Sequence, residues 1–237
     1  MNRDKTFRVD SASAWIRLSV VLLMSVVVGV GMWSIVVILP AVQVDLGLSR
    51  SQASLPYVFT MIGYGIGGIV FGRFSDKYGI YKAVLVGIML ISLGYFVASF
   101  ATGVGLLCLS QGLLIGIGTS TTFAPLIAHV SHWFDRRKGA AVGIIASGQY
   151  LSGAIWPTIL ESGVQDFGWQ QTYWFVGFIV LVLALPLSLV LRKVPATDKS
   201  LISVVADLDQ KGSSFSPTWL IMLLMVSVFC CCIAMSM

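Results

Sequence analysis

Charged side chains leave long stretches of this chain uninterrupted. None of its 15 Lys and Arg or 10 Asp and Glu residues falls within 18–44, 51–72, 83–134, 139–160, 167–191 or 212–237. A helix needs about 20 mainly apolar residues to cross the hydrocarbon core of a bilayer, and 83–134 is long enough for two such helices. The sequence therefore predicts an integral membrane protein with six spans and the start of a seventh.

The composition excludes a soluble domain and favours helices over a barrel. The chain is 57% hydrophobic and only 11% charged, with a mean hydropathy of +0.91, whereas soluble proteins carry about 25% charged residues. Strands of a membrane barrel would alternate in polarity, but these stretches are continuously apolar. The apolar run 18–44 also exceeds the roughly 7–15 residues of a signal-peptide core. We therefore expect an all-α fold whose first helix is not cleaved.

The basic residues predict the orientation in the membrane, because short exported loops are poor in Lys and Arg. Every Lys and Arg except Arg50 lies in the N-terminal tail, the loops after the second and fourth spans, or the segment after the sixth. The N-terminus is therefore expected in the cytoplasm, with the protein in the plasma (inner) membrane. Although the pI is about 9.1, these bases do not form one continuous face, so no nucleic-acid partner is expected.

The order of the segments predicts a six-helix bundle followed by a linker and a further helix. A tail over 1–16 precedes spans at about 17–41, 54–73, 83–101, 105–128, 139–160 and 172–191. A polar stretch over 192–216 is the expected cytoplasmic linker, and 217–237 is expected to be a truncated seventh helix. Six helices followed by a linker are typical of one half of a two-bundle transporter.

Glycines recur every four residues in two of the expected spans. The pairs are Gly63/Gly67, Gly68/Gly72 and Gly112/Gly116. This spacing places small residues on one helix face, where two backbones can approach closely. We expect these faces to pack helices within the chain, with dimer formation as the less favoured alternative.

Two loops carry the most specific sequence motifs. The loop after the second span contains Gly72, Asp76, Gly79 and Lys82, in which Gly79 is expected to form a tight turn. The loop after the fourth span contains Trp133, Phe134, Arg136, Arg137 and Gly139. The first set resembles the signature between helices 2 and 3 of the major facilitator superfamily. The second resembles the corresponding loop of its monocarboxylate-porter and oxalate:formate-antiporter-like branch.

The resemblance implies two six-helix bundles, each built from two inverted three-helix repeats, that rock around a central site. It also implies that helices 1, 2, 4 and 5 of this half line the solute cavity. At the expected mid-depth of those helices lie the candidate cavity residues Trp33, Tyr64, Thr119, Thr121, Thr122, Gln149 and Tyr150. The alternative is that the hydroxyl groups bond to carbonyls of their own helices and that Tyr64 only packs.

Metal and catalytic sites find little support in the sequence. His129 and His132 are spaced for one helix face, but no third ligand accompanies them, so an interfacial role is favoured. Cys108 and Cys230–Cys232 lie inside expected spans without a metal-binding pattern. With neither a nucleotide-binding loop nor a catalytic constellation, we expect a protein that is not an enzyme and has no cofactor.

The combined expectation is the N-terminal half of a secondary transporter that moves a small solute, such as an organic anion of the monocarboxylate class, by alternating access. Its partners would be the bilayer, the solute, and a complementary six-helix half or second chain. Because the charge-free stretches leave no Asp, Glu, Lys or Arg in the interior of the spans, the cation for an anionic solute would come from that other half. Two alternatives remain open: a neutral or apolar solute, and a non-transporting six-helix scaffold that binds a partner.

Overall fold

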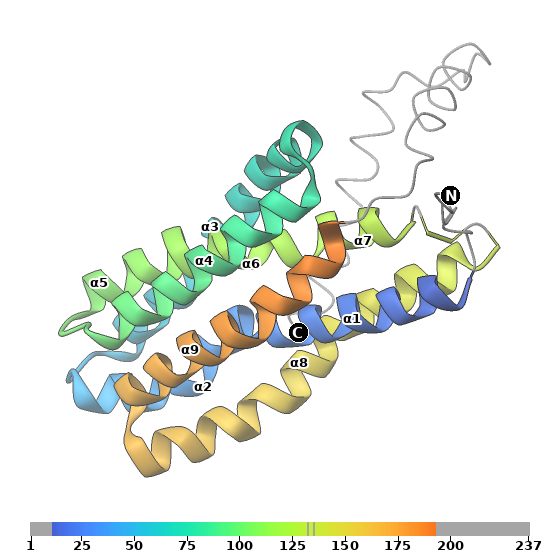
Figure 1. Ribbon diagram of the computed structural model, residues 1–237. Helices are drawn as coiled ribbons and strands as arrows, with labels where there is room; N and C mark the ends of the chain where they lie inside the picture. The colour runs from blue at the N-terminus through green and yellow to red at the C-terminus, as the bar shows by residue number, and fades with distance from the viewer. Residues whose placement is uncertain (1–10, 132, 135, 193–237) are drawn as a thin grey trace, which may run out of the picture. The chain divides into compact units, whose positions relative to one another are not determined.

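The computed structural model describes residues 11–131, 133–134 and 136–192, and all regular structure in these ranges is helical (Figure 1). The tail 1–10, His132, Asp135, the linker after Arg192 and the helix expected over 217–237 lie outside the described residues. The elements are α1 (Ala12–Val28), α2 (Val30–Asp45), α3 (Arg50–Tyr78), α4 (Ile80–Ser99), α5 (Val104–Leu109), η1 (Ser110–Gly116), α6 (Ile117–Thr119), η2 (Ser120–Thr122), α7 (Ala124–Ser131), α8 (Lys138–Phe167), α9 (Trp169–Ser188) and η3 (Leu189–Arg192).

These elements form six rods. The first joins α1 and α2 across Gly29, the fourth comprises α5 to α7, and the sixth is α9 with η3. Five of the rods are long and apolar enough to cross a membrane: Ser13–Asp45, Arg50–Tyr78, Ile80–Ser99, Val104–Ser131 and Trp169–Arg192. The expected all-α membrane fold is therefore confirmed. The remaining rod, α8, has 30 residues but is not among these five, because polar side chains and glycine interrupt its apolar sequence.

Two similar helix pairs reveal the internal repeat. The 29-residue α3 and the 20-residue α4 are joined at Gly79, and the 30-residue α8 and the 20-residue α9 are joined at Gly168. Gly79 has φ +85° and Gly168 has φ +81°, a backbone conformation that L side chains rarely adopt. Each reversal of the chain therefore depends on one glycine, and the two reversals lie at opposite ends of the bundle.

Glycine allows the second and fourth rods to pack backbone to backbone. A Cβ atom on Gly63 would meet the Gly112 carbonyl, and one on Gly116 would lie 2.6 Å from the Thr60 carbonyl oxygen. A Cβ atom on Gly67 would likewise lie 2.8 Å from the Ile117 backbone. The predicted packing role is thus confirmed for Gly63/Gly67 and Gly112/Gly116. The pair Gly68/Gly72 differs, because among the described residues nothing lies within 4 Å of a Cβ atom there.

The fourth rod departs from a regular α-helix. After α5 the chain forms a π-helical turn over Ser110–Gly116, returns to α geometry, and then tightens into a 3-10 turn over Ser120–Thr122. A π turn shifts the side-chain register and is frequent at functional sites. This rod contacts both α3 and α4, so its irregular part lies inside the bundle.

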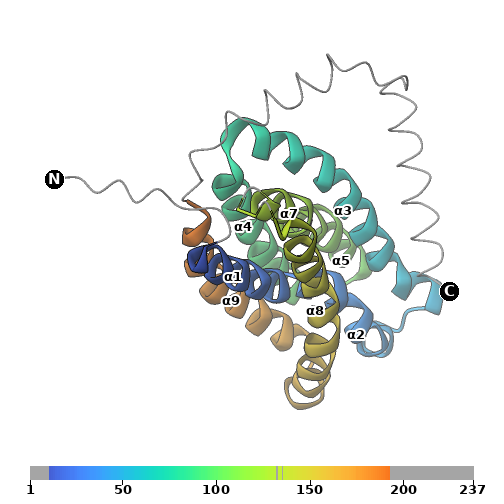
Figure 2. The same cartoon turned by 90° about the vertical axis from the view of Figure 1, so that its right-hand side faces the viewer.

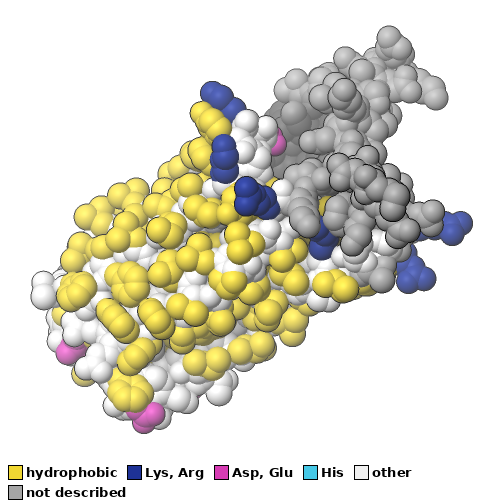
Figure 3. Space-filling model, viewed as in Figure 1, with side chains coloured by type: hydrophobic (Ala, Val, Ile, Leu, Met, Phe, Trp, Pro, Cys, Tyr) yellow, Lys and Arg dark blue, Asp and Glu magenta, His cyan; other side chains and the backbone are white. Residues whose placement is uncertain are grey.

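The surface has two chemically different ends separated by an apolar band. Figure 3 shows Lys and Arg gathered toward one end of a largely hydrophobic face, with the acidic side chains mainly at the opposite end. We call the first the basic end; its described residues include Lys77, Lys82, Arg136–Lys138 and Arg192. The acidic end includes Asp45, Glu161 and Asp166.

Candidate functional site

Helix α8 exposes two faces of different chemistry. One is apolar and comprises Leu151, Ile155 and Ile159, which are 43%, 46% and 51% exposed. The other, which we call the polar face of α8, comprises the exposed residues Gly143, Ser147, Tyr150, Ala154 and Thr158. Their spacing of three or four residues places them along one side of the helix. Because polar groups are costly in hydrocarbon, this side of α8 suits water, a solute or another protein surface better than lipid.

Helix α3 offers a comparable small-residue face. A Cβ atom added to Gly65, Gly68 or Gly72 would have no described atom within 4 Å, and Tyr64 lies half-buried beside these glycines. Helix α7 contacts both α3 and α8 and lies between them in the end-on view (Figure 2). The two faces therefore belong to helices on either side of the fourth rod.

Trp33 is joined to the middle of α8. Its indole Nε1–H donates to the Gln149 carbonyl oxygen at 3.3 Å. A Cβ atom on Gly153 would lie 2.6 Å from the Trp33 ring, so the indole fills the space that the glycine leaves. The structure thus brings together the candidates Trp33 and Gln149, next in sequence to Tyr150, which is 59% exposed.

Reciprocal small-residue contacts hold α1 against α8 near this position. A Cβ atom on Gly29 would lie 2.5 Å from the Ser152 hydroxyl, and one on Gly148 would lie 3.0 Å from the Ser25 hydroxyl. Trp156 adds a hydrogen bond from its Nε1–H to the Val26 carbonyl oxygen at 2.8 Å. Close packing of this kind fixes the position of α8 relative to the first rod.

The three candidate threonines lie inside the bundle. Thr119, Thr121 and Thr122 are 0% exposed. Their hydroxyl groups donate to carbonyls of the same rod, at 2.7, 2.8 and 2.8 Å. Thr119 also packs against Gly31, and Thr121 against Gly87. The contacts of these threonines are therefore those of the packing alternative, and they do not join the polar face of α8.

A buried polar cluster connects five of the six rods. The Gln111 Nε2–H donates to the Tyr173 hydroxyl at 2.7 Å, and the Thr60 hydroxyl donates to the Gln111 Oε1 at 3.3 Å. Beside them the Tyr95 hydroxyl donates to the Ser34 hydroxyl at 2.8 Å, and the Tyr95 and Tyr173 rings meet edge to face at 5.1 Å. All five side chains are 0% exposed. Sequence reasoning missed this cluster, although Gln111 is the one amide side chain within 83–134.

Comparison with known proteins decides the family. A sequence model of the Major Facilitator Superfamily matches residues 21–237. The chain belongs to the major facilitator superfamily. This assignment confirms the resemblance carried by the two loops.

The similar proteins in the superfamily include transporters of several kinds. The chain is 35% identical over 140 residues to an MFS-type transporter (pytF) of Aspergillus terreus, covering 59% of this chain and 47% of that protein. It is 37% identical over 124 residues to monocarboxylate transporter 13 of Bos taurus, covering 52% of this chain and 28% of that protein. It is 32% identical over 144 residues to the fujikurins efflux protein of Gibberella fujikuroi, covering 61% of this chain and 31% of that protein. The alignments thus span less than half the length of these relatives.

The superfamily loop between the second and third rods forms the junction of α3 and α4. Gly79 ends α3, and its N–H donates to the Ser75 carbonyl oxygen at 2.9 Å. Asp76 and Lys82 are exposed. Gly72 lies one helical turn before Asp76, and a Cβ atom there would have no described atom within 4 Å. α4 follows Gly79 directly and begins without a side-chain cap.

The superfamily loop between the fourth and fifth rods is anchored by its aromatic residues. Trp133 and Phe134 are 2% and 1% exposed. The Arg17 guanidinium lies 4.2 Å from the Trp133 ring centroid and donates to the Val190 carbonyl oxygen at 3.0 Å. Trp15 meets Phe134 edge to face at 5.2 Å. The motif thus packs against the start of the first rod, and Arg17 bonds that rod to the end of the sixth. Arg136, Arg137 and Gly139 are exposed.

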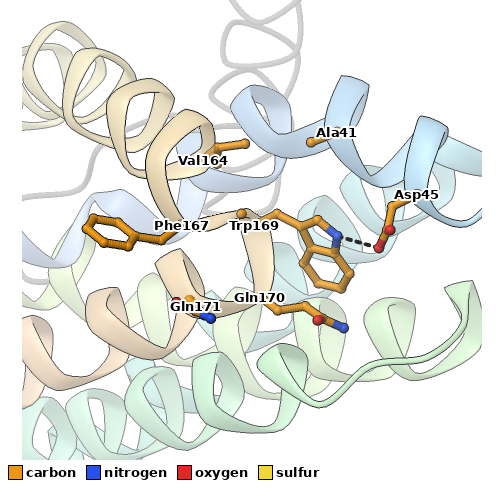
Figure 4. A pocket seen from close by; sticks show the side chains of 8 residues that line it. Ala41, Asp45, Val164, Phe167, Trp169, Gln170 and Gln171 are labelled. Carbon is orange, nitrogen blue, oxygen red and sulfur yellow. Dashed lines mark hydrogen bonds between the residues drawn. The ribbon is translucent and has the colours of Figure 1, made fainter.

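A polar pocket of about 240 Å³ lies at the acidic end of this superfamily bundle. Figure 4 shows the Trp169 indole directed at Asp45, with Gln170 below the ring. The Trp169 Nε1–H donates to the Asp45 Oδ2 at 2.9 Å, and the Gln170 Nε2–H donates to the Ala101 carbonyl oxygen at 3.2 Å. The first bond joins the end of α2 to the start of α9, and the second joins the start of α9 to the loop after α4. Among the described residues, no three His, Cys, Asp or Glu side chains group as a metal site, and His129 lies near Trp133, with ring centroids 6.4 Å apart.

Proposed function

We propose that this superfamily chain is the N-terminal half of a secondary transporter that moves a small organic anion, such as a monocarboxylate, by alternating access. The observation that carries the proposal is the polar face of α8, with Trp33 bound to the adjacent backbone of Gln149. Exposed hydroxyl groups on this face suit a wet or proteinaceous neighbour better than lipid. The Ser147 hydroxyl also donates to the Ile144 carbonyl oxygen of its own helix at 2.7 Å. A solute path shared with a complementary half supplies one.

Tyr64, Gln149 and Tyr150 are the side chains that we assign to this path, together with Trp33. They come from the second, fifth and first rods, and each keeps at least part of its surface exposed. Aromatic and amide groups can orient a solute by packing and hydrogen bonding. Thr119, Thr121 and Thr122 are left out, because they are buried and bonded to their own rod.

The proposed solute class rests on relatives and on charge. Several similar proteins are monocarboxylate transporters by name. The apolar core of each span lacks Lys and Arg, so the cation that would bind a carboxylate is assigned to the complementary half. A neutral or apolar solute is the second candidate, since it would need no cation from the spans of either half.

The basic end is proposed to face the cytoplasm of a plasma (inner) membrane, because Lys and Arg are retained on that side. Accessible tags placed after Leu48 and after Lys138 test this orientation in intact cells. An impermeant reagent should label the first tag and not the second. Equal labelling of both would overturn the topology and with it the proposed half-transporter.

Uptake into liposomes tests the function. This chain should carry no labelled monocarboxylate by itself but should do so together with a six-helix C-terminal half, and Tyr150→Ala should reduce that uptake. The scaffold alternative predicts a well-folded pair that moves none of a panel of mono- and dicarboxylates and neutral solutes. Transport of neutral solutes alone would retain the transporter and reject the anion.

A further inference from the structure

A second cavity lies at the basic end, outside the proposed solute path. It has a volume of about 520 Å³ and is formed by the junction of α3 and α4 together with the end of the sixth rod. Its polar lining consists of Tyr78, Tyr81, Lys82 and Arg192. Lys82 and Arg192 are exposed and come from different rods, so the cavity combines two cations with two phenol groups.

Negative charge is missing from the described lining of this cavity. Asp76 is the acidic residue nearest in sequence, and it does not line the cavity. Lys77, on the same turn, lies over the Tyr78 ring at 5.3 Å and adds positive charge at the edge. Lys82 occupies the first turn of α4, where the helix dipole disfavours a cation. An anion in the cavity would offset both the repulsion among these cations and the unfavourable interaction of Lys82 with the helix dipole.

An apolar surface of membrane depth leads into this cavity. On α4, Lys82 continues a row of exposed side chains at three- and four-residue spacing: Val86, Met89 and Leu93. On the sixth rod, Arg192 continues a similar row: Phe178, Val182 and Leu189. α4 and α9 pack side by side (Figure 1), and Figure 3 shows bases at one end of an apolar face. The two cations thus stand where acyl chains lying on that face would meet their headgroup.

We propose that this cavity binds the phosphate of an anionic phospholipid, with the acyl chains along the exposed rows of α4 and α9. Lys82 and Arg192 supply charge, and the Tyr78 and Tyr81 hydroxyl groups supply hydrogen bonds to phosphate oxygens. Basic pockets between membrane helices are suited to such headgroups. A free phosphate ester shares the charge but not the apolar rows, so the two ligands can be separated by experiment.

Native mass spectrometry of the purified full chain in mild detergent tests the proposal, with phosphatidylglycerol, phosphatidylcholine and soluble glycerol phosphate as probes. The chain should retain phosphatidylglycerol in preference to phosphatidylcholine. Each removed cation should reduce that preference about fivefold, so Lys82→Gln with Arg192→Gln should reduce it by more than tenfold. Arg137→Gln with Lys138→Gln is the matched control, since it removes two exposed bases from the same end but away from the cavity.

Four results would overturn the proposal. They are an equal loss in the control pair, an unchanged preference in the Lys82/Arg192 pair, no preference in the unaltered chain, and displacement of the lipid by an equal concentration of glycerol phosphate. Lys82→Arg with Arg192→Lys preserves charge and should keep the preference, which separates lipid binding from misfolding. The measurement does not involve transport, so its outcome is independent of the proposed transport function.

Discussion

The Gln111 amide nitrogen donates a hydrogen bond to the Tyr173 hydroxyl at 2.7 Å, and both side chains are fully buried in the bundle. Gln111 lies in the π-helical turn of the fourth rod, and its carbonyl oxygen accepts from Thr60 on α3. One side chain therefore links three rods at a point where lipid and water are both excluded. The irregular turn places both ends of the amide opposite partners.

Replacing Gln111 by Leu should lower the thermal stability of the detergent-solubilised protein. The change leaves the Tyr173 hydroxyl without its amide partner, which costs about 1–3 kcal/mol for a buried polar group. Thermal unfolding measures the effect. Gln171→Leu is the control, because Gln171 is exposed at the surface. Equal unfolding temperatures for the two variants would contradict a structural role for the cluster.

A single methyl group at Gly63 should weaken the packing between α3 and the fourth rod. A Cβ atom there meets the backbone carbonyl of Gly112, which cannot rotate away. Overpacking of this kind typically costs about 1–3 kcal/mol. Gly65→Ala, two residues along the same helix, should be neutral or slightly stabilising, since nothing described lies within 4 Å and Ala favours helices. Similar stability of the two variants would contradict the close approach.

Tyr150→Ala should reduce uptake by the assembled transporter by about tenfold, with little change in expression or unfolding temperature. Tyr150 is on the polar face of α8, and losing a positioning contact of about 1.4 kcal/mol changes a rate by that factor. Leu151→Ala, on the apolar face of the same turn, should leave uptake nearly unchanged. A larger loss in Leu151→Ala than in Tyr150→Ala would move the solute path to the other face.

Asp45→Ala should destabilise the acidic end, since the Trp169 indole loses its acceptor. We expect a loss of about 1 kcal/mol. Asp45→Asn keeps an acceptor oxygen and should cost less than half as much. Thermal unfolding ranks the variants, with Asp166→Ala as a control for removing an exposed acid at the same end. If Ala and Asn at position 45 were equally harmful, charge rather than this hydrogen bond would be responsible.

Asp76→Asn should slow uptake while leaving membrane insertion intact. Asp76 is exposed at the end of α3 and does not cap α4, so its carboxylate is available to a partner that forms in another conformation. Initial uptake rates and the amount of inserted protein are the two measurements. An unchanged uptake rate would show that the Asp76 carboxylate has no role in the alternating-access motion.

Several features of the fold were predictable because they follow from local rules. The position of Gly79 between two apolar segments predicted a reversal that L residues rarely form, and its φ of +85° bears this out. Charge-free segments predicted the helices, because lipid leaves the backbone no partner other than itself. The glycine pairs were only partly predictable: Gly63 and Gly67 face a neighbouring rod, whereas Gly68 and Gly72 face none of the described rods. Spacing shows which residues share a face but not what covers it.

By itself the sequence determined that this chain is a helical membrane protein, since the cost of unpaired backbone and buried charge in lipid acts segment by segment. Only the tertiary structure decided that Gln111 joins Thr60 and Tyr173, that Trp133 lies under Arg17, and that the candidate threonines are interior. These contacts link residues far apart in the chain. They depend on a π turn and on glycine-mediated approach of the rods, which alter helix register and spacing in ways that no local pattern specifies.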